Sequence, residues 1–235
     1  MTIDTNSVAD ISRNLLSIEV ANFIRREILN GTLRPGDHLI EATFAQRLQT
    51  SKSPVREAFR LLEAEGLVVN YPHRGSFVTQ LDPRDVWELD TLRAVLEPFA
   101  AELALEKIDQ DGIRKLEALV SAMDSVENEI VMSQLHADFH KTIIHCSGHK
   151  RIIEILDGLW AQMNLLLVIT HFGHLKKETI RHDHQLLLEA IKQRNAAQVR
   201  KLFREHVYGT LPGLMQSLNA ELESGAATIQ EIQAS

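Results

Sequence analysis

The sequence predicts a mainly α-helical protein in which a small β-hairpin follows the first helices. Two observations support this fold class. Residues 41–80 contain two short amphipathic helix patterns and then two strand patterns joined by a turn. From residue 82 onwards, apolar side chains recur at helical spacing without strand-like alternation. We therefore expect an N-terminal domain (1–80), a C-terminal antiparallel helical bundle (81–222) and a flexible tail (223–235).

The two helices predicted within 41–80 are separated by a short polar turn. The first spans about 41–48 and places Phe44 on its apolar face. A polar run ends it, and either Ser51 or Ser53 can cap the second helix. Pro54 falls in the first turn of that second helix, where no backbone donor is needed.

The second helix has an apolar face and a basic face. Its apolar residues recur at i, i+3, i+4 and i+7, and they are Val55, Ala58, Phe59 and Leu62. Its basic residues recur every fourth position, and they are Lys52, Arg56 and Arg60. The helix is therefore predicted to pack with one side and to leave a positive side exposed.

A β-hairpin follows this helix directly. Gly66 ends the helix, and strands are predicted at 67–71 and 76–79, with Arg74 in the turn between them. A helix-turn-helix followed by a hairpin can place its second helix in the DNA major groove and the hairpin beside it as a wing. The arrangement predicts a winged helix-turn-helix that binds double-stranded DNA.

Four blocks of residues in this region resemble the winged helix-turn-helix of the GntR family of bacterial transcription regulators. In chain order they are Gly31-Thr-Leu-Arg-Pro-Gly36, Ser53-Pro-Val-Arg-Glu-Ala58, Glu65-Gly-Leu-Val68 and Arg74-Gly-Ser-Phe-Val78. The resemblance implies a DNA-binding transcription regulator, with repression relieved by a metabolite as the usual pattern. The expected DNA contacts are Arg47, Lys52, Ser53, Arg56 and the wing-tip residues His73, Arg74 and Gly75.

The charge of the chain is distributed unevenly between the two predicted domains. The net charge is −7, yet residues 1–80 hold nine basic and nine acidic side chains, so the second domain carries the excess acid. Between Arg47 and Arg74 five basic residues face three acidic ones. The expected DNA surface is thus modestly positive, and we expect a homodimer to supply much of the affinity.

The sequence predicts a cytoplasmic protein without a membrane-spanning segment. No apolar run reaches membrane-spanning length, and residues 1–14 lack the basic start and apolar core of a signal peptide. The single cysteine, Cys146, has no partner for an intrachain disulfide and is predicted to be a packing residue.

The second domain is predicted to contain about six helices. Asp82 and Pro83 open the first, in which Pro98 is expected to produce a kink and Leu89, Leu92, Leu96 and Ala100 form the apolar stripe. Asp109 and Asn195 are candidate caps of later helices. The other helical runs lie near 112–126, 129–146, 150–169 and 175–194. Such a bundle has room for a ligand between facing helices.

Nine of the eleven histidines lie between His136 and His206. His136 and His140 share one helix face, a spacing suited to a metal ion. His184 is in phase with apolar neighbours, and His206 shares a face with Leu202, whereas His145 and His149 are expected to be exposed. Spacing alone leaves a metal site and ordinary buried histidines equally open.

The second domain also resembles the FadR-type C-terminal domain of GntR regulators, in the subgroup that binds a divalent metal. The matching segments are 92–103, Phe139-His140, Ser147-Gly148, 184–191 and Arg204-Glu-His206. By position, the resemblance implies His136, His140, His184 and His206 as metal ligands. This chain departs from the subgroup at His136, where the family most often has Asp.

That departure has chemical consequences. Four neutral imidazoles leave the charge of a divalent ion uncompensated, and an all-nitrogen ligand set favours zinc, nickel or copper, with zinc or nickel expected here. The resemblance implies that a small carboxylate effector binds at open metal positions. Arg93 is a candidate second clamp for that carboxylate, and the alternative for Arg93 is a salt bridge to Glu97.

Two other functions remain open from the sequence. The dipeptide His182-Asp183 is found in metal-dependent phosphohydrolases, but no later aspartate is present to complete their ligand set. Alternatively, the helical domain only dimerises, with a metal that stabilises it structurally. The preferred interpretation is a regulator without enzymatic activity.

Overall fold

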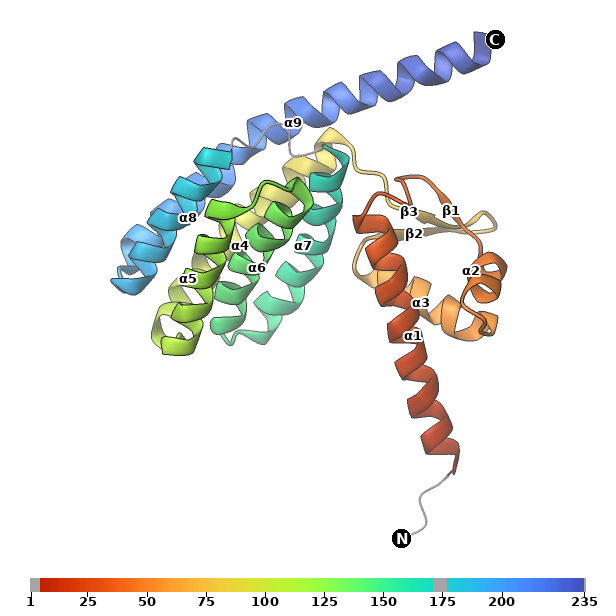
Figure 1. Cartoon of the computed structure of the whole chain (residues 1–235), viewed down its shortest axis with the longest axis horizontal. Helices are drawn as coiled ribbons and strands as arrows, with labels where there is room; N and C mark the ends of the chain where they lie inside the picture. Colours follow the sequence, from red (N-terminus) through yellow and green to blue (C-terminus); the bar gives the residue numbers. More distant parts are fainter. Residues whose placement is uncertain (1–4, 171–176, 235) are drawn as a thin grey trace. The chain divides into compact units, whose positions relative to one another are not determined.

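The computed structural model describes residues 5–170 and 177–234. Within it the chain forms two compact units, Met1–Gln80 and Leu81–Ser235. The winged helix-turn-helix is in the first unit and the helical bundle in the second, as Figure 1 shows by the colours along the chain.

The N-terminal unit contains four helical or strand elements that the sequence predicts and two that it does not. The elements are α1 (Thr5–Leu29), β1 (His38–Leu39), α2 (Glu41–Arg47), α3 (Lys52–Ala64), β2 (Val68–Tyr71) and β3 (Gly75–Val78). Helix α1 and strand β1 are the additions. Helix α1 packs against α3 through Val20, Ala21, Ile24 and Ile28, all of which are buried. These residues recur at helical spacing, so the signal for α1 is present in the sequence.

The apolar face of α3 is buried as predicted. Val55, Ala58, Phe59 and Leu62 all belong to the core, and the Phe44 ring of α2 packs edge-on to Phe59 at 5.8 Å between ring centroids. Ser51 occupies the N-cap position of α3, although its side chain makes no capping hydrogen bond. Gly66 follows the helix with a φ of +73°, the left-handed conformation that suits glycine after a helix.

The three strands of the described N-terminal unit form an antiparallel sheet in the order β1-β3-β2. Phe77 of β3 pairs with His38 on one side and with Val69 on the other. The predicted hairpin strands, 67–71 and 76–79, agree with β2 and β3 to within one residue at each end. Strand β1 has only two residues, which is too short for a period-two pattern to be visible in the sequence.

The C-terminal unit is helical throughout its described part. Its helices are α4 (Pro83–Lys107), α5 (Gln110–Ser125), α6 (Glu129–Cys146), α7 (Lys150–Ile169), α8 (Lys177–Lys192) and α9 (Ala196–Ala234). Residues 175 and 176 of the predicted run 175–194 lie outside the described residues. Helix α9 continues to Ala234, through most of the segment 223–235 where we expected a flexible tail. That segment is rich in the good helix formers Ala, Glu and Gln, so local propensity favours continuation.

Helix α4 differs from its prediction in which residues face the core. Asp82 and Asp85 form a reciprocal capping box at its start, and the helix continues through Pro98. Leu92, predicted to be part of the apolar stripe, is 43% exposed. The buried face instead carries the charged residues Asp90, Arg93 and Glu97. The Leu92 assignment is therefore wrong, whereas Leu89 and Ala100 of the predicted stripe are buried; the buried side of α4 also takes in the mutually paired Asp90, Arg93 and Glu97.

The helices of this unit form two connected groups of contacts. Helix α6 contacts α4, α5 and α7, while α9 contacts α4 and α8; Figure 1 shows α5, α6 and α7 side by side. The core includes Leu116, Met123, Phe139, Ile143 and Phe203, none of which is more than 1% exposed. None of the helices in the described ranges is long and apolar enough to span a membrane.

Candidate metal centre and nucleic-acid interface

Four histidines meet inside the C-terminal unit. His136 and His140 come from α6, His184 from α8 and His206 from α9, and all four side chains are buried. Each offers one nitrogen, and these four nitrogens lie within 4.8 Å of one another. All four residues implied as ligands by the sequence resemblance are thus brought together.

The distances between ring nitrogens suit a common ligand. The Nε2 atom of His206 lies 3.2 Å from Nε2 of His140 and 3.4 Å from Nε2 of His136. Two nitrogens bound to one tetrahedral zinc, with bonds of about 2.1 Å, are separated by about 3.4 Å. The observed spacings therefore match neighbouring ligands of a transition metal.

Hydrogen bonds fix the tautomers of three of these histidines. Nδ1 of His140 donates to Glu97 Oε2 at 2.7 Å, and Nδ1 of His184 donates to the backbone oxygen of Ile180 at 2.6 Å. Nδ1 of His206 donates to Asp183 Oδ2 at 3.2 Å. Because a carboxylate or a carbonyl oxygen can only accept, Nδ1 carries the proton and Nε2 keeps its lone pair for a metal.

His184 provides a second indication that the cluster suits a metal ion. Its Nε2 atom is buried and has no hydrogen-bond partner among the described residues. A buried polar atom without a partner costs free energy, about 1–3 kcal/mol in typical cases. Coordination of a cation would satisfy this lone pair, so the residues present fit a metal ion.

His136 differs from the other three histidines. Its Nδ1 atom is buried without a partner in the described part of the chain, and its ring lies edge-on to Trp160, with 5.4 Å between centroids. No oxygen acceptor therefore orients His136 as Glu97 and Asp183 orient their histidines. His136 also stands at the position where the resembling subgroup most often has Asp.

Burial keeps three of the four histidines unprotonated. Burial is the largest cause that lowers the pKa of His136 and of His140 well below the usual value, and neighbouring histidines and Arg93 lower both further. Burial likewise lowers the pKa of His184 to about 3. The imidazoles of His136, His140 and His184 are therefore neutral at neutral pH, which is the form that binds metals.

Arg93 belongs to a buried charge network next to the cluster. Its Nε donates to Glu97 Oε1 at 2.7 Å, and its Nη1 donates to Asp90 Oδ1 at 3.0 Å. The guanidinium also lies over the Trp160 ring, 4.3 Å from its centroid. Arg93 thus forms the salt bridge that the sequence left as the alternative to an effector clamp, and Glu97 links it to His140.

The carboxyl group of Asp90 is the least well compensated member of this network. Burial raises the pKa of Asp90 to about 6, against the opposing effect of Arg93. Its Oδ2 atom has no hydrogen-bond partner among the described residues. One oxygen of Asp90 is therefore buried without a protein hydrogen bond.

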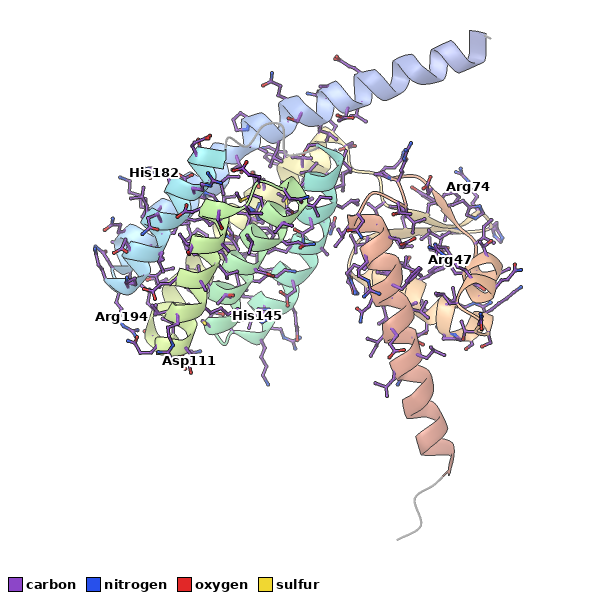
Figure 2. The ribbon with its side chains drawn as sticks, in the orientation of Figure 1. Arg47, Arg74, Asp111, His145, His182 and Arg194 are labelled. Atoms are coloured by element: carbon purple, nitrogen blue, oxygen red, sulfur yellow. The ribbon has the colours of Figure 1, made fainter. Side chains whose placement is uncertain are left out.

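The remaining histidines named by the sequence lie away from the cluster. His145 is exposed and contacts Asp157 at 3.0 Å, and His149 is exposed as well. His182 is exposed while its neighbour Asp183 turns inward to His206, so the dipeptide does not act as a pair of ligands. Figure 2 shows His145 at the same end of the helical unit as Asp111, with His182 towards the other end.

Three groups important to the cluster were not identified from the sequence. They are Glu97, Asp183 and the backbone oxygen of Ile180, which orient the histidine rings. Glu97 follows Asp90 and Arg93 at helical spacing, which could have indicated a polar inner face. A backbone acceptor leaves no signal in the sequence.

The expected DNA-contacting residues lie on exposed parts of the N-terminal unit. Lys52 and Ser53 occupy the exposed first turn of α3, and Arg56 follows one turn later. Arg56 pairs with Glu41 of α2 through two hydrogen bonds, each 2.8 Å long. Arg47 pairs with Glu27 at 2.9 Å and is half exposed.

The hairpin between β2 and β3 forms the predicted wing. His73 at its tip has a φ of +63°, and the Arg74 guanidinium lies 5.5 Å from the Tyr71 ring centroid. Gly75 has a φ of +96°, and a Cβ atom there would lie only 2.8 Å from His38 Nε2. Figure 2 labels Arg47 and Arg74 among the side chains of this unit.

Models of two protein families match the chain. The model described as bacterial regulatory proteins, gntR family, matches residues 16–78, and the FCD domain model matches residues 88–209. The first match covers the helix-turn-helix and its wing, and the second contains all four histidines of the cluster.

Named relatives and solved structures agree with these matches. The HTH-type transcriptional regulator McbR of Escherichia coli is 27% identical, over 87% of this chain and 95% of its own. The gluconate operon transcriptional repressor of Bacillus subtilis is 28% identical, over 80% of each. The structure of E. coli McbR/YncC covers 86% of this chain and 97% of its own, with a TM-score of 0.71 and 25% identity. A GntR regulator from Rhodococcus sp. RHA1 shares the fold, with a TM-score of 0.74 at 23% identity, over 85% of this chain and 97% of its own. The chain therefore belongs to the GntR family of bacterial transcription regulators and carries an FCD domain in its C-terminal unit.

Proposed function

We propose that this regulator is a cytoplasmic repressor that binds operator DNA as a homodimer, and that a metal ion and a small carboxylate in the FCD domain control its affinity for DNA. Two of its relatives, from Bacillus subtilis and Bacillus licheniformis, are named gluconate operon transcriptional repressors, which supports repression. The part of the proposal that concerns the metal and the effector depends on the histidine cluster.

The observation that carries the proposal is the convergence of four buried imidazoles on one point. His136, His140, His184 and His206 would hold the ion through their ring nitrogens. An all-nitrogen set favours zinc or nickel over magnesium, calcium or manganese. When bound, the metal supplies a positive charge inside the domain.

The chemistry around the cluster supports an anionic effector. The four imidazoles contribute no negative charge, so they leave the charge of a divalent cation uncompensated. Glu97 and Asp90 are already paired with Arg93, through its Nε–H and one hydrogen of Nη1. One hydrogen of Nη1 and both hydrogens of Nη2 remain, and we propose that Arg93 contacts the carboxylate through these donors.

The cluster also connects the helices that would have to move. Its ligands come from α6, α8 and α9, and Glu97 adds α4 through its contact with His140. A carboxylate that binds one arrangement of these helices better than another shifts the population towards it. Coupling of this kind between two sites is typically about 1–3 kcal/mol.

An exposed apolar face on α4 supports the homodimer. Leu92, Val95 and Phe99 follow one another at helical spacing and are 43%, 59% and 47% exposed. Two copies that pair through this face would bury it and present two α3 helices to a pseudo-palindromic operator. We expect Val95→Glu to produce monomers in analytical ultracentrifugation, and Leu186→Glu on α8 to leave the dimer intact. A Val95→Glu variant that stays dimeric would remove this face from the interface.

A regulator whose metal only stabilises the FCD domain is the second candidate. Three of the four histidines are positioned by hydrogen bonds, which a purely structural site also requires. The two functions differ in one measurement, the affinity for operator DNA with and without small carboxylates. A change with at least one carboxylate supports effector control, and no change across a broad panel supports the structural role.

A further inference from the structure

On the exposed side of the N-terminal unit, Glu41 and Arg56 form a two-point ion pair. Nε of Arg56 donates to Glu41 Oε1 and Nη2 donates to Glu41 Oε2, each at 2.8 Å. The two residues come from different helices, since Glu41 is the first residue of α2 and Arg56 lies in the middle of α3. The pair therefore fixes the arginine side chain relative to a second helix.

The contact uses only one side of the guanidinium. An arginine has five N–H donors, and Glu41 takes the Nε–H and one hydrogen of Nη2. Both hydrogens of Nη1 and the second hydrogen of Nη2 remain free of Glu41. Together they form a two-pronged donor edge, the pattern that matches O6 and N7 of guanine in the major groove.

The pair is accessible to DNA. The Arg56 side chain is 59% exposed and that of Glu41 is 30% exposed. The hydrogen bonds from Arg56 are the largest cause that holds the pKa of Glu41 below its usual value, and the positive charges of Lys52 and Arg60 lower it further. Glu41 is consequently ionised at neutral pH, and the pair has no net charge.

An ion pair without net charge binds phosphate weakly, but its fixed N–H donors suit hydrogen bonds to a base edge. Phosphate contacts come from unpaired positive charge and release counterions, whereas base contacts depend on the orientation of donors. Lys52 has no ion pair among the described residues, so it has the freedom to bind phosphate. Arg56, held by Glu41, presents a fixed donor edge at the cost of its net charge.

We infer that Glu41 is a positioning residue for sequence recognition: it holds Arg56 so that the free edge of the guanidinium reads one guanine in each operator half-site. This inference rests on the proposed DNA binding by α3. Glu41 acts through Arg56 and does not itself contact the base. Removal of the Glu41 carboxylate leaves the charge of Arg56 unpaired and its side chain less firmly held. Binding to the operator should therefore weaken, while binding to unrelated DNA should strengthen.

The test uses an operator selected by the wild-type protein from a random duplex library. Affinities for this operator and for unrelated DNA are then measured for Glu41→Ala, Glu41→Asp and Arg56→Ala. We expect Glu41→Ala to weaken operator binding about tenfold, the effect of losing one good bidentate base contact, and to strengthen binding to unrelated DNA. Glu41→Asp keeps the charge but shortens the reach, so we expect it to lose discrimination as well.

A second selection identifies the base pair involved. When the selection is repeated with Glu41→Asp and with Arg56→Ala, both variants should show a relaxed preference for guanine, at the same position. Glu57→Ala is the matched control, because Glu57 forms a single contact of 3.3 Å with Arg60 on the same helix, and its selected sequence should not change.

The other outcomes separate the explanations. Stronger binding of Glu41→Ala to every DNA would mean that Glu41 only competes with phosphates, and equal weakening for every DNA would mean a role in folding alone. Either result overturns the inference. Failure of the wild-type protein to select any sequence would instead contradict the proposed function.

Discussion

Acidification should destabilise the metal-free C-terminal unit through its buried histidines. The folded state lowers the pKa of His136, His140 and His184, whereas unfolded histidines keep a pKa of about 6.5. Below that pH the unfolded chain binds more protons than the folded chain, so stability falls as pH falls. For these groups the loss begins near the unfolded pKa and continues until the folded pKa is reached, about 3 for His184.

The size of this effect follows from the linkage relation. A histidine that stays neutral when folded loses about 1.3 kcal/mol of stability between pH 7 and pH 5.5, so three such residues lose about 4 kcal/mol. A typical domain has a free energy of unfolding of about 5–15 kcal/mol, so the loss is easily measured. A metal bound to the cluster competes with protons and should reduce the loss.

Tryptophan fluorescence during urea unfolding provides the assay. The chain has two tryptophans, the exposed Trp87 and the buried Trp160, whose ring lies 4.9 Å from that of His140. A Trp87→Phe background leaves Trp160 as the reporter of the C-terminal unit. In this background His184→Gln should lose about 1.3 kcal/mol less than its parent between pH 7 and pH 5.5. A metal-free protein whose stability changes by less than about 1 kcal/mol over this range would refute the argument that the histidines are buried and neutral.

Three further variants test other parts of the structure. Glu97→Gln should lower metal affinity about 10- to 100-fold in a chelator competition, since Glu97 orients His140; unchanged affinity would contradict that role. His136→Asp should retain the metal but bind carboxylates more weakly in calorimetry, because it adds a negative charge beside the ion, and equal or tighter binding would contradict the charge argument. Gly75→Ala should destabilise the N-terminal unit by about 1 kcal/mol or more in thermal unfolding, because of its positive φ and the close His38 ring; an unchanged melting temperature would count against it.

The sequence predicted the helix-turn-helix well because its signals are local. The apolar face of α3, the glycine after it and the hairpin turn each depend on residues that are close in sequence. The family resemblance placed the four histidines together, which spacing could not do, because His136 and His206 are 70 positions apart. Their convergence depends on how α6, α8 and α9 pack.

The errors also have a physical origin. Apolar spacing predicts that Leu92 lies in the core, but on α4 the pairing of Arg93 with Asp90 and Glu97 lets three charged residues share the buried face with apolar ones. The pairing of Glu41 with Arg56 joins two helices and has no periodic signature. Contacts between elements, and the burial of groups that compensate one another, are set by tertiary structure and not by local pattern.

We propose that the ligand state of the histidine cluster controls DNA binding. The decisive measurement is the affinity of the metal-loaded protein for its selected operator, by fluorescence anisotropy, across a panel of small carboxylates. We expect at least one carboxylate to change the affinity by about 5- to 150-fold, the usual range of coupling between two sites, and His184→Ala to abolish the change. The same affinity with every carboxylate, in a protein shown to hold its metal, would contradict control of DNA binding by this cluster.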